Sequence, residues 1–286
     1  MTVYVAACLK DRHPDVHLAI RLALEDAGIP LVEVAGTGNI WIRDWMPIPV
    51  GDHFVKFCMK ADVAKWPFLE VTDDCWCNLP CFPQGVTLAT TLILDGGNVV
   101  RSPDGTRVIM TSCSWVDNNF TLEATHPLCE LLQARIVWIS PEPGDELGHA
   151  DGIVSWVDDH TVFLNDYRSM RTPEYRHYEK MVRRQLLAAG IDTIPFPYAY
   201  DLCPQITEGR FRQEYPEADD FNPGYGYYLN FLHVGNAILY PVFGRDRDER
   251  AVDALTAVYP ACKLYPVDCA RLSMEGGLLH CISWEI

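Results

Sequence analysis

Helical and strand-like patterns of apolar residues alternate along the whole chain. The spacing of the apolar residues predicts helices over 16–28, 122–133, 174–190 and 247–258. A short apolar run after each helix predicts a strand, over 30–34, 134–140, 191–198 and 263–268. A turn with Gly or Asn follows, and then a further predicted strand that carries polar residues. This order of elements predicts an α/β protein.

The polar strands form a repeat along the sequence. They recur roughly every 50–80 residues, a period typical of propeller-like or solenoid arrays. Unlike the units of a solenoid, each carries its own polar residues, which are Asp44, Asp95, His149 with Asp151, Asn230 and Cys281. If the five units circle a common axis, these side chains converge on one central pocket.

No Ser/Gly/Pro linker or low-complexity tract divides the chain, so we expect one domain over 1–286. The longest interruption of the pattern is 201–226, which is rich in Pro, Gly and acidic residues. This composition predicts a long loop. Such a loop is either a lid over the site or an ordinary surface excursion, and the sequence leaves both readings open.

Charge and composition narrow the function classes. About half of the residues are apolar and 22% are charged, as in globular proteins, and the formal net charge is −16. This charge argues against nucleic acid and anionic membranes as partners and favours a cationic small molecule. The N-terminal segment has no basic stretch, and its apolar run is too short for a signal peptide, so we expect a cytoplasmic protein. Homo-oligomerisation stays open.

The cysteine content does not indicate a disulfide scaffold. The chain has 11 cysteines, an odd number, and we expect most of them to be thiols in a reducing compartment. Cys75, Cys77 and Cys81 have spacings that could hold zinc, but no fourth ligand lies at a suitable distance in the sequence. We therefore expect neither a metal nor a cofactor.

Two segments carry candidate proton-transfer and nucleophilic groups. Cys281 follows Gly276 and Gly277, and glycines allow close approach of a ligand or another backbone. His149 and Asp151 are two residues apart, so in a strand they point to the same face. We expect His149 to transfer protons and Asp151 to bind a cation or to orient groups. A structural pair at the start of a strand is the alternative.

Two further carboxylates occur in apolar surroundings. Asp44 stands between two tryptophans and next to Arg43. Neighbouring strand residues point to opposite faces, which argues against an ion pair between Asp44 and Arg43. Asp95 ends an apolar run before a Gly-Gly pair, where it is either a site residue or a carboxylate that caps the turn.

Five motifs in order resemble the agmatine deiminase and bacterial peptidylarginine deiminase family of the guanidine-modifying pentein superfamily. They are Trp41-x-Arg43-Asp44 with Pro47, Asp95-Gly96-Gly97-Asn98, Gly148-His149-x-Asp151, Asn230-Phe231 followed by ILYPVFG, and Gly276-Gly277-x-x-His280-Cys281-Ile282. They cover nearly the whole chain. The resemblance implies the pentein fold, a five-fold pseudosymmetric α/β propeller built from ββαβ-type units.

The resemblance also implies a role for each residue of the site. Cys281 would be the nucleophile and His149 the general acid and base, while Asp44 and Asp151 would clamp the guanidinium. Asp95 matches the acidic residue of the acid-Gly-Gly element, next to the histidine or the substrate. Trp41 and Asn230 would contribute to substrate binding.

The resemblance implies a hydrolytic deiminase acting on an arginine-like small molecule, with agmatine as the model substrate. The chain departs from the family pattern at Trp45-Met46, where glycine commonly precedes the proline, and at 149–152, which read HADG instead of HVDN. These departures leave open peptidyl, free or methylated arginine as substrates. Three other functions are alternatives: an amidinotransferase, a non-catalytic pentein that binds a partner, and a Cys-His-Asp protease.

Overall fold

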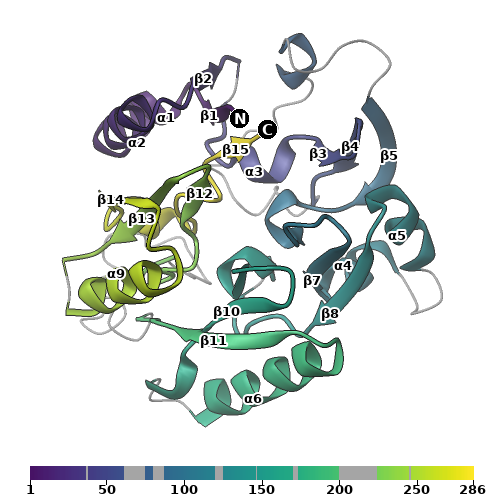
Figure 1. Cartoon of the computed structure of the whole chain (residues 1–286). Helices are drawn as coiled ribbons and strands as arrows, with labels where there is room; N and C mark the ends of the chain where they lie inside the picture. The colour runs from purple at the N-terminus through teal and green to yellow at the C-terminus, as the bar shows by residue number, and fades with distance from the viewer. Residues whose placement is uncertain are drawn as a thin grey trace, which may run out of the picture.

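The computed structural model describes residues 1–36, 38–60, 75–79, 87–119, 125–145, 147–169, 173–199, 224–244 and 246–286. Within these residues, five three-stranded sheets are arranged as a ring (Figure 1). The fold is the predicted five-fold pseudosymmetric α/β propeller of the pentein type.

Every sheet has the same topology. Its central strand pairs antiparallel with a short first strand and parallel with a last strand. In the order first, central and last, the sheets are β15 (Trp284–Glu285), β1 (Val3–Ala6) and β2 (Leu31–Val34); β3 (Ile48–Val50), β4 (His53–Cys58) and β5 (Thr87–Ile93); β6 (Val100–Arg101), β7 (Arg107–Thr111) and β8 (Arg135–Ile139); β9 (Val154–Trp156), β10 (Thr161–Asn165) and β11 (Asp192–Phe196); β12 (Leu232–Val234), β13 (Ala237–Val242) and β14 (Lys263–Asp268).

A parallel pair of strands needs a crossover, and in four units the described part of that crossover contains an α-helix on the outside of the sheet. These helices are α2 (Pro14–Ala27), α5 (His126–Leu132), α6 (Pro173–Ala188) and α9 (Asp246–Val258). They lie on the outside of the ring in Figure 1. The four predicted helices and the strands that follow them are thus confirmed. Helix α2 begins with a proline and ends at Gly28, whose left-handed backbone (φ 71°) suits glycine.

The two ends of the chain close the ring. Strand β15 pairs antiparallel with β1, with Val3 opposite Glu285 and Tyr4 opposite Trp284. The rings of Tyr4 and Trp284 meet edge to face, with centroids 5.2 Å apart, and both side chains are buried. The C-terminal strand therefore completes the sheet that the N-terminal strand begins, and it fixes the segment just before it.

The segments with the predicted site residues are turns, and the prediction of polar strands is wrong there. Asp44 lies on a single helical turn, α3 (Ile42–Trp45). Asp95 directly precedes a short 3-10 helix, η3 (Gly96–Asn98), and His149 directly precedes another, η5 (Ala150–Gly152), which contains Asp151. Asn230 and Cys281 also stand outside strands. The reason is that the first strand of each sheet is only two or three residues long, so pairing begins after the motif. Short polar side chains and glycines favour such turns.

Two other expectations fall on residues outside the description. Of the expected loop at 201–226, residues 201–223 are not described. The possible zinc cluster includes Cys81, which also lies outside the described residues, whereas Cys77 is described and is exposed. Among the helices that the structure describes, none combines the length and the apolar character required for a membrane span.

Candidate active site

Five turns bring the predicted site residues together. Each turn comes immediately before the first strand of one sheet, so the pseudosymmetry of the ring places the turns in equivalent positions. From β3 to β15, they carry Asp44, Asp95, His149 with Asp151, Asn230 and Cys281. Contacts between these side chains join units that are far apart in the sequence.

The imidazole of His149 lies between two carboxylates. Its Nε2 is 3.2 Å from Asp95 Oδ2, and its Nδ1 is 3.7 Å from Asp44 Oδ1. Burial on its own disfavours the charged ring, but Asp44, Asp95 and Asp151 outweigh burial and raise the pKa of His149 to about 10. The ring is therefore protonated at neutral pH in the empty site.

Gly97 makes this arrangement sterically feasible. Its backbone N–H donates to Asp44 Oδ1 at 2.9 Å. A Cβ at position 97 would lie 2.6 Å from His149 Nδ1 and 2.9 Å from Asp44 Oδ1, closer than real Cβ contacts allow. A Cβ on Gly96 would lie 2.0 Å from the carbonyl oxygen of Arg43. The Gly-Gly pair is thus required by close approach of the neighbouring turn.

Asp44 is a carboxylate that the empty site keeps partly protonated. Burial is the main cause, and the negative charges of Asp95 and Asp151 add to it. Together they raise the pKa of Asp44 to about 7, against the favourable effects of His149 and of the Gly97 N–H. A cation entering the site would stabilise the ionised form.

Cys281 is buried and held by Asn230. The side-chain amide of Asn230 donates to Cys281 Sγ at 3.1 Å, and its Oδ1 accepts from the backbone N–H groups of His280 (3.1 Å) and Cys281 (3.3 Å). Burial, together with the charges of Asp151 and Asp44, raises the pKa of the Cys281 thiol well above its usual value. Cys281 is therefore a neutral thiol at neutral pH.

Asp151 contacts both His280 and Cys281. Its Oδ2 lies 2.7 Å from His280 Nδ1 and 3.6 Å from Cys281 Sγ. Burial alone would raise the pKa of Asp151, but the hydrogen bond and charge of His280 outweigh burial and lower it. Asp151 is therefore ionised at neutral pH and faces the thiol.

Arg43 fastens the first turn to the C-terminal one. Its backbone N–H donates to the Cys281 carbonyl at 3.1 Å, and its Nε donates to the His280 carbonyl at 3.2 Å. Its guanidinium pairs with Glu285 on β15, which leaves the neighbouring Asp44 free of the ion pair with Arg43 that the sequence offered as an alternative.

Trp41 reaches the other side of the same turn. A Cβ on Gly277 would lie 2.4 Å from a Trp41 ring carbon and 3.1 Å from Cys281 Cβ. The second glycine pair therefore lets the indole approach the cysteine, and Trp41 itself stays half-buried. Its predicted contact with substrate remains a prediction.

The sequence did not reveal several contacts of the site. His280 belongs to the matched motif, but its hydrogen bond to Asp151 could not be inferred from its position before Cys281. The sequence predicted that Asn230 contributes to substrate binding, which stays a prediction, but it did not predict the contact of its amide with the thiol. The backbone N–H of Lys60 donates to Asp95 Oδ1 at 2.9 Å. A backbone donor of this kind does not depend on the type of residue, so the sequence could not predict it.

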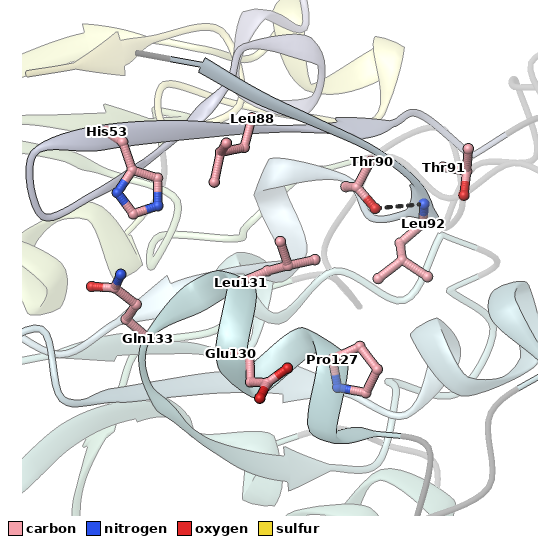
Figure 2. A pocket seen from close by; sticks show the side chains of 9 residues that line it. All are labelled: His53, Leu88, Thr90, Thr91, Leu92, Pro127, Glu130, Leu131 and Gln133. Carbon is pink, nitrogen blue, oxygen red and sulfur yellow. Dashed lines mark hydrogen bonds between the residues drawn. The ribbon is translucent and has the colours of Figure 1, made fainter. Parts of the chain in front are cut away.

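A separate surface cavity of about 550 Å³ lies between β5 and α5 (Figure 2). His53 and Leu88 line one side, and Glu130 and Leu131 line the other. None of the predicted site residues lines it. Across the described residues, no group of three or more His, Cys, Asp or Glu side chains is arranged to hold a metal ion.

Comparison with known proteins gives a consistent result along the whole chain. The family model described as Porphyromonas-type peptidyl-arginine deiminase matches residues 2–286. An agmatine deiminase of Ectopseudomonas mendocina is 25% identical over 93% of this chain and 78% of its own length.

Solved structures share the fold at lower identity. The agmatine deiminase of Enterococcus faecalis superimposes with a TM-score of 0.76 at 16% identity, over 99% of this chain and 92% of that one. A cysteine-to-serine variant of the C. jejuni agmatine deiminase with substrate bound has a TM-score of 0.71 at 16% identity, with the same coverage.

Proposed function

This chain belongs to the Porphyromonas-type peptidyl-arginine deiminase family, and from that premise we propose that it hydrolyses the guanidinium group of an arginine-like small molecule, with Cys281 as nucleophile. The observation that supports this proposal most directly is the meeting of a buried thiol, a protonated imidazole and three carboxylates at one point of the ring. The proposal treats residues 1–286 as one catalytic domain.

The carboxylates suit a guanidinium. This group is planar, always charged and presents its N–H donors as a fork, which carboxylates accept in pairs. We assign Asp44 and Asp151 as the two clamps. With His149 protonated, the three carboxylates leave the empty site net negative, so a cation gains affinity from charge as well as from geometry.

Substrate binding is also the step that activates the thiol. The charges of Asp151 and Asp44 contribute to the high pKa of Cys281, and a guanidinium held by both carboxylates offsets them. The thiol releases its proton to solvent. The thiolate then attacks the central guanidinium carbon along the normal of its plane and forms a tetrahedral adduct.

His149 completes both halves of the reaction. As an acid it gives its proton to the departing nitrogen, so ammonia leaves and a covalent thiouronium remains on Cys281. The neutral imidazole then takes a proton from water as the water attacks the same carbon. When the C–S bond of this second adduct breaks, its hydroxyl proton returns to the sulfur, and the neutral ureido product and the Cys281 thiol are released. Acid–base assistance of this kind typically contributes about 10²–10⁴ in rate.

An agmatine-like substrate fits best with the relatives. The E. mendocina and E. faecalis proteins are both agmatine deiminases. The net charge of −16 also favours a substrate with a second positive charge over one with a carboxylate tail. Free, methylated and peptidyl arginine are the competing substrates.

A substrate panel tests the proposal. Ammonia and ureido product would be measured with agmatine, arginine, methylated arginines and an arginyl peptide, and with Cys281→Ala as the control. We expect turnover of agmatine with equal amounts of ammonia and ureido product. Absence of ureido product from every compound, or full activity of Cys281→Ala, would overturn the proposal.

A further inference from the structure

A buried glutamate stands behind the site and takes no part in the proposed chemistry. Glu142 follows β8, is 3% exposed and accepts hydrogen bonds from three tyrosine hydroxyls. Tyr167 donates to Oε2 at 2.6 Å, Tyr227 donates to Oε1 at 2.9 Å, and Tyr198 also donates to Oε1. The three tyrosines come from three segments, in η6 (Tyr167–Ser169), after β11 and before β12.

Burying the Glu142 carboxylate costs free energy that an apolar side chain at this position would not cost. Burial raises the pKa of Glu142 to about 7, against the three hydrogen bonds that favour its charge. An apolar side chain of similar volume would avoid this cost. A carboxylate has enough acceptor sites to accept hydrogen bonds from all three tyrosine hydroxyls at once. A function in holding the three segments together accounts for its presence.

One branch of the network reaches the turn that carries Asp151. Asn165 Nδ2 donates to the Tyr167 hydroxyl at 3.2 Å and to the carbonyl of Gly152 at 2.7 Å. The ring of Tyr227 packs on the same turn, because a Cβ on Gly152 would lie 3.3 Å from its Cδ1. Glu142 thus supports the residue next to Asp151 from behind.

The other branch reaches the cysteine. The backbone N–H of Asn230 donates to the carbonyl of Tyr227 at 3.1 Å, and the Asn230 side chain donates to Cys281 Sγ. Tyr227 therefore contacts both turns while its hydroxyl is held by Glu142.

We propose that Glu142 is a positioning residue of the deiminase site, which acts through Tyr227, Tyr198 and Tyr167 to fix the distance between Asp151 and the Asn230–Cys281 pair. The proposal rests on the proposed function for its effect on turnover. Its effect on the environment of Cys281 is independent of any substrate.

Two variants test the network against a matched control. Tyr227→Phe and Glu142→Gln each remove hydrogen bonds of the network with little change in volume. Tyr178→Phe is the control, since the Tyr178 ring contacts Tyr167 (centroids 5.3 Å apart) but its hydroxyl donates to the Ser140 carbonyl at 3.0 Å. Tyr227→Phe loses a single hydroxyl and provides a test if Glu142→Gln does not fold.

Two readouts separate positioning from general stability. The first is kcat with agmatine, and the second is the rate at which iodoacetamide alkylates Cys281 in the empty enzyme, followed on the Cys281 peptide by mass spectrometry. We expect about tenfold lower kcat in Tyr227→Phe and Glu142→Gln, since small misplacements of reacting groups are costly. We also expect a change of about threefold or more in the alkylation rate. Tyr178→Phe should stay within about twofold of wild type in both.

Wild-type kcat and alkylation rates in folded Tyr227→Phe and Glu142→Gln would overturn the proposal. Equal losses in Tyr178→Phe would overturn it as well, because the effect would then belong to aromatic packing in general. If the wild-type protein turns over no guanidinium compound, the proposed function fails, and the alkylation rates still decide whether Glu142 controls the position of Cys281.

Discussion

Cys281 Sγ lies 3.6 Å from Asp151 Oδ2, although 130 positions separate the two residues in the sequence. A cysteine side chain so close to an ionised carboxylate keeps its proton, because the negative charge opposes the loss of that proton. The same carboxylate is suited to bind the cationic substrate. Binding and activation are therefore coupled through one side chain.

The first prediction is that ligand binding ionises Cys281. In the enzyme without ligand at pH 8 we expect no thiolate at this position, because burial and the charges of Asp151 and Asp44 raise the pKa of the thiol. A bound guanidinium should offset those charges, lower this pKa and make a thiolate signal appear. The measurement is the thiolate absorbance near 240 nm, with and without millimolar guanidinium, as the difference between wild type and Cys281→Ser. A thiolate already present at pH 7 without ligand would contradict the coupling.

The second prediction concerns the nucleophile itself. Cys281→Ala should abolish turnover and retain substrate binding, since Asp44 and Asp151, the proposed clamps, remain in place. Turnover is measured as ureido product and affinity by calorimetry. Cys262→Ala is the matched control, because Cys262 is a half-buried free thiol immediately before β14 and outside the site. Its removal should leave kcat within about twofold. Loss of binding in Cys281→Ala would mean that the thiol is part of the clamp.

The third prediction is a dependence of affinity on pH set by Asp44. Its pKa of about 7 in the empty site means that it is protonated below that pH, whereas a guanidinium requires the ionised form. Affinity should therefore fall as pH decreases below about 7, by at most about tenfold per pH unit, and level off above it. Calorimetry with Cys281→Ala between pH 5.5 and 9 measures this without turnover.

Asp44→Asn provides the control for that profile. In a Cys281→Ala background it should bind weakly at every pH and lose most of the pH dependence, because the titrating group has been removed. A profile that is unchanged in the double variant would assign the titration to another group.

The elements and the ring were predictable from the sequence, because four amphipathic helices, each followed by an apolar strand, repeat with their own polar residues. The closure by β15 and β1 was not predictable. Two short strands at opposite ends of a chain carry no signal of their pairing, and register is set by contacts that only the folded ring provides.

The sequence also predicted which side chains meet in the ring, but it did not predict their local structure. His149 and Asp151 were placed on one face of a strand by a period of two, and the structure has a 3-10 turn there instead. A polar run of three or four residues fits either period, so the pattern alone could not distinguish them. The partner of each side chain, such as His280 for Asp151, depends on turns from different sheets.

The fourth prediction is that Gly97→Ala removes activity from a folded enzyme. The added methyl group would lie 2.6 Å from His149 Nδ1 and 2.9 Å from Asp44 Oδ1, so the imidazole and the clamp must separate. Displacing both by a few tenths of an ångström or more should lower kcat/KM by about 10²-fold.

Gly105→Ala is the control. Its φ of +74° makes alanine costly for stability, by about 1 kcal/mol, but its Cβ would meet no atom within 4 Å. We expect Gly105→Ala to lower Tm and leave kcat/KM unchanged. We expect Gly97→Ala to lower kcat/KM and leave the enzyme folded. Wild-type kcat/KM in Gly97→Ala would show that His149 and Asp44 need not be in the contact seen here.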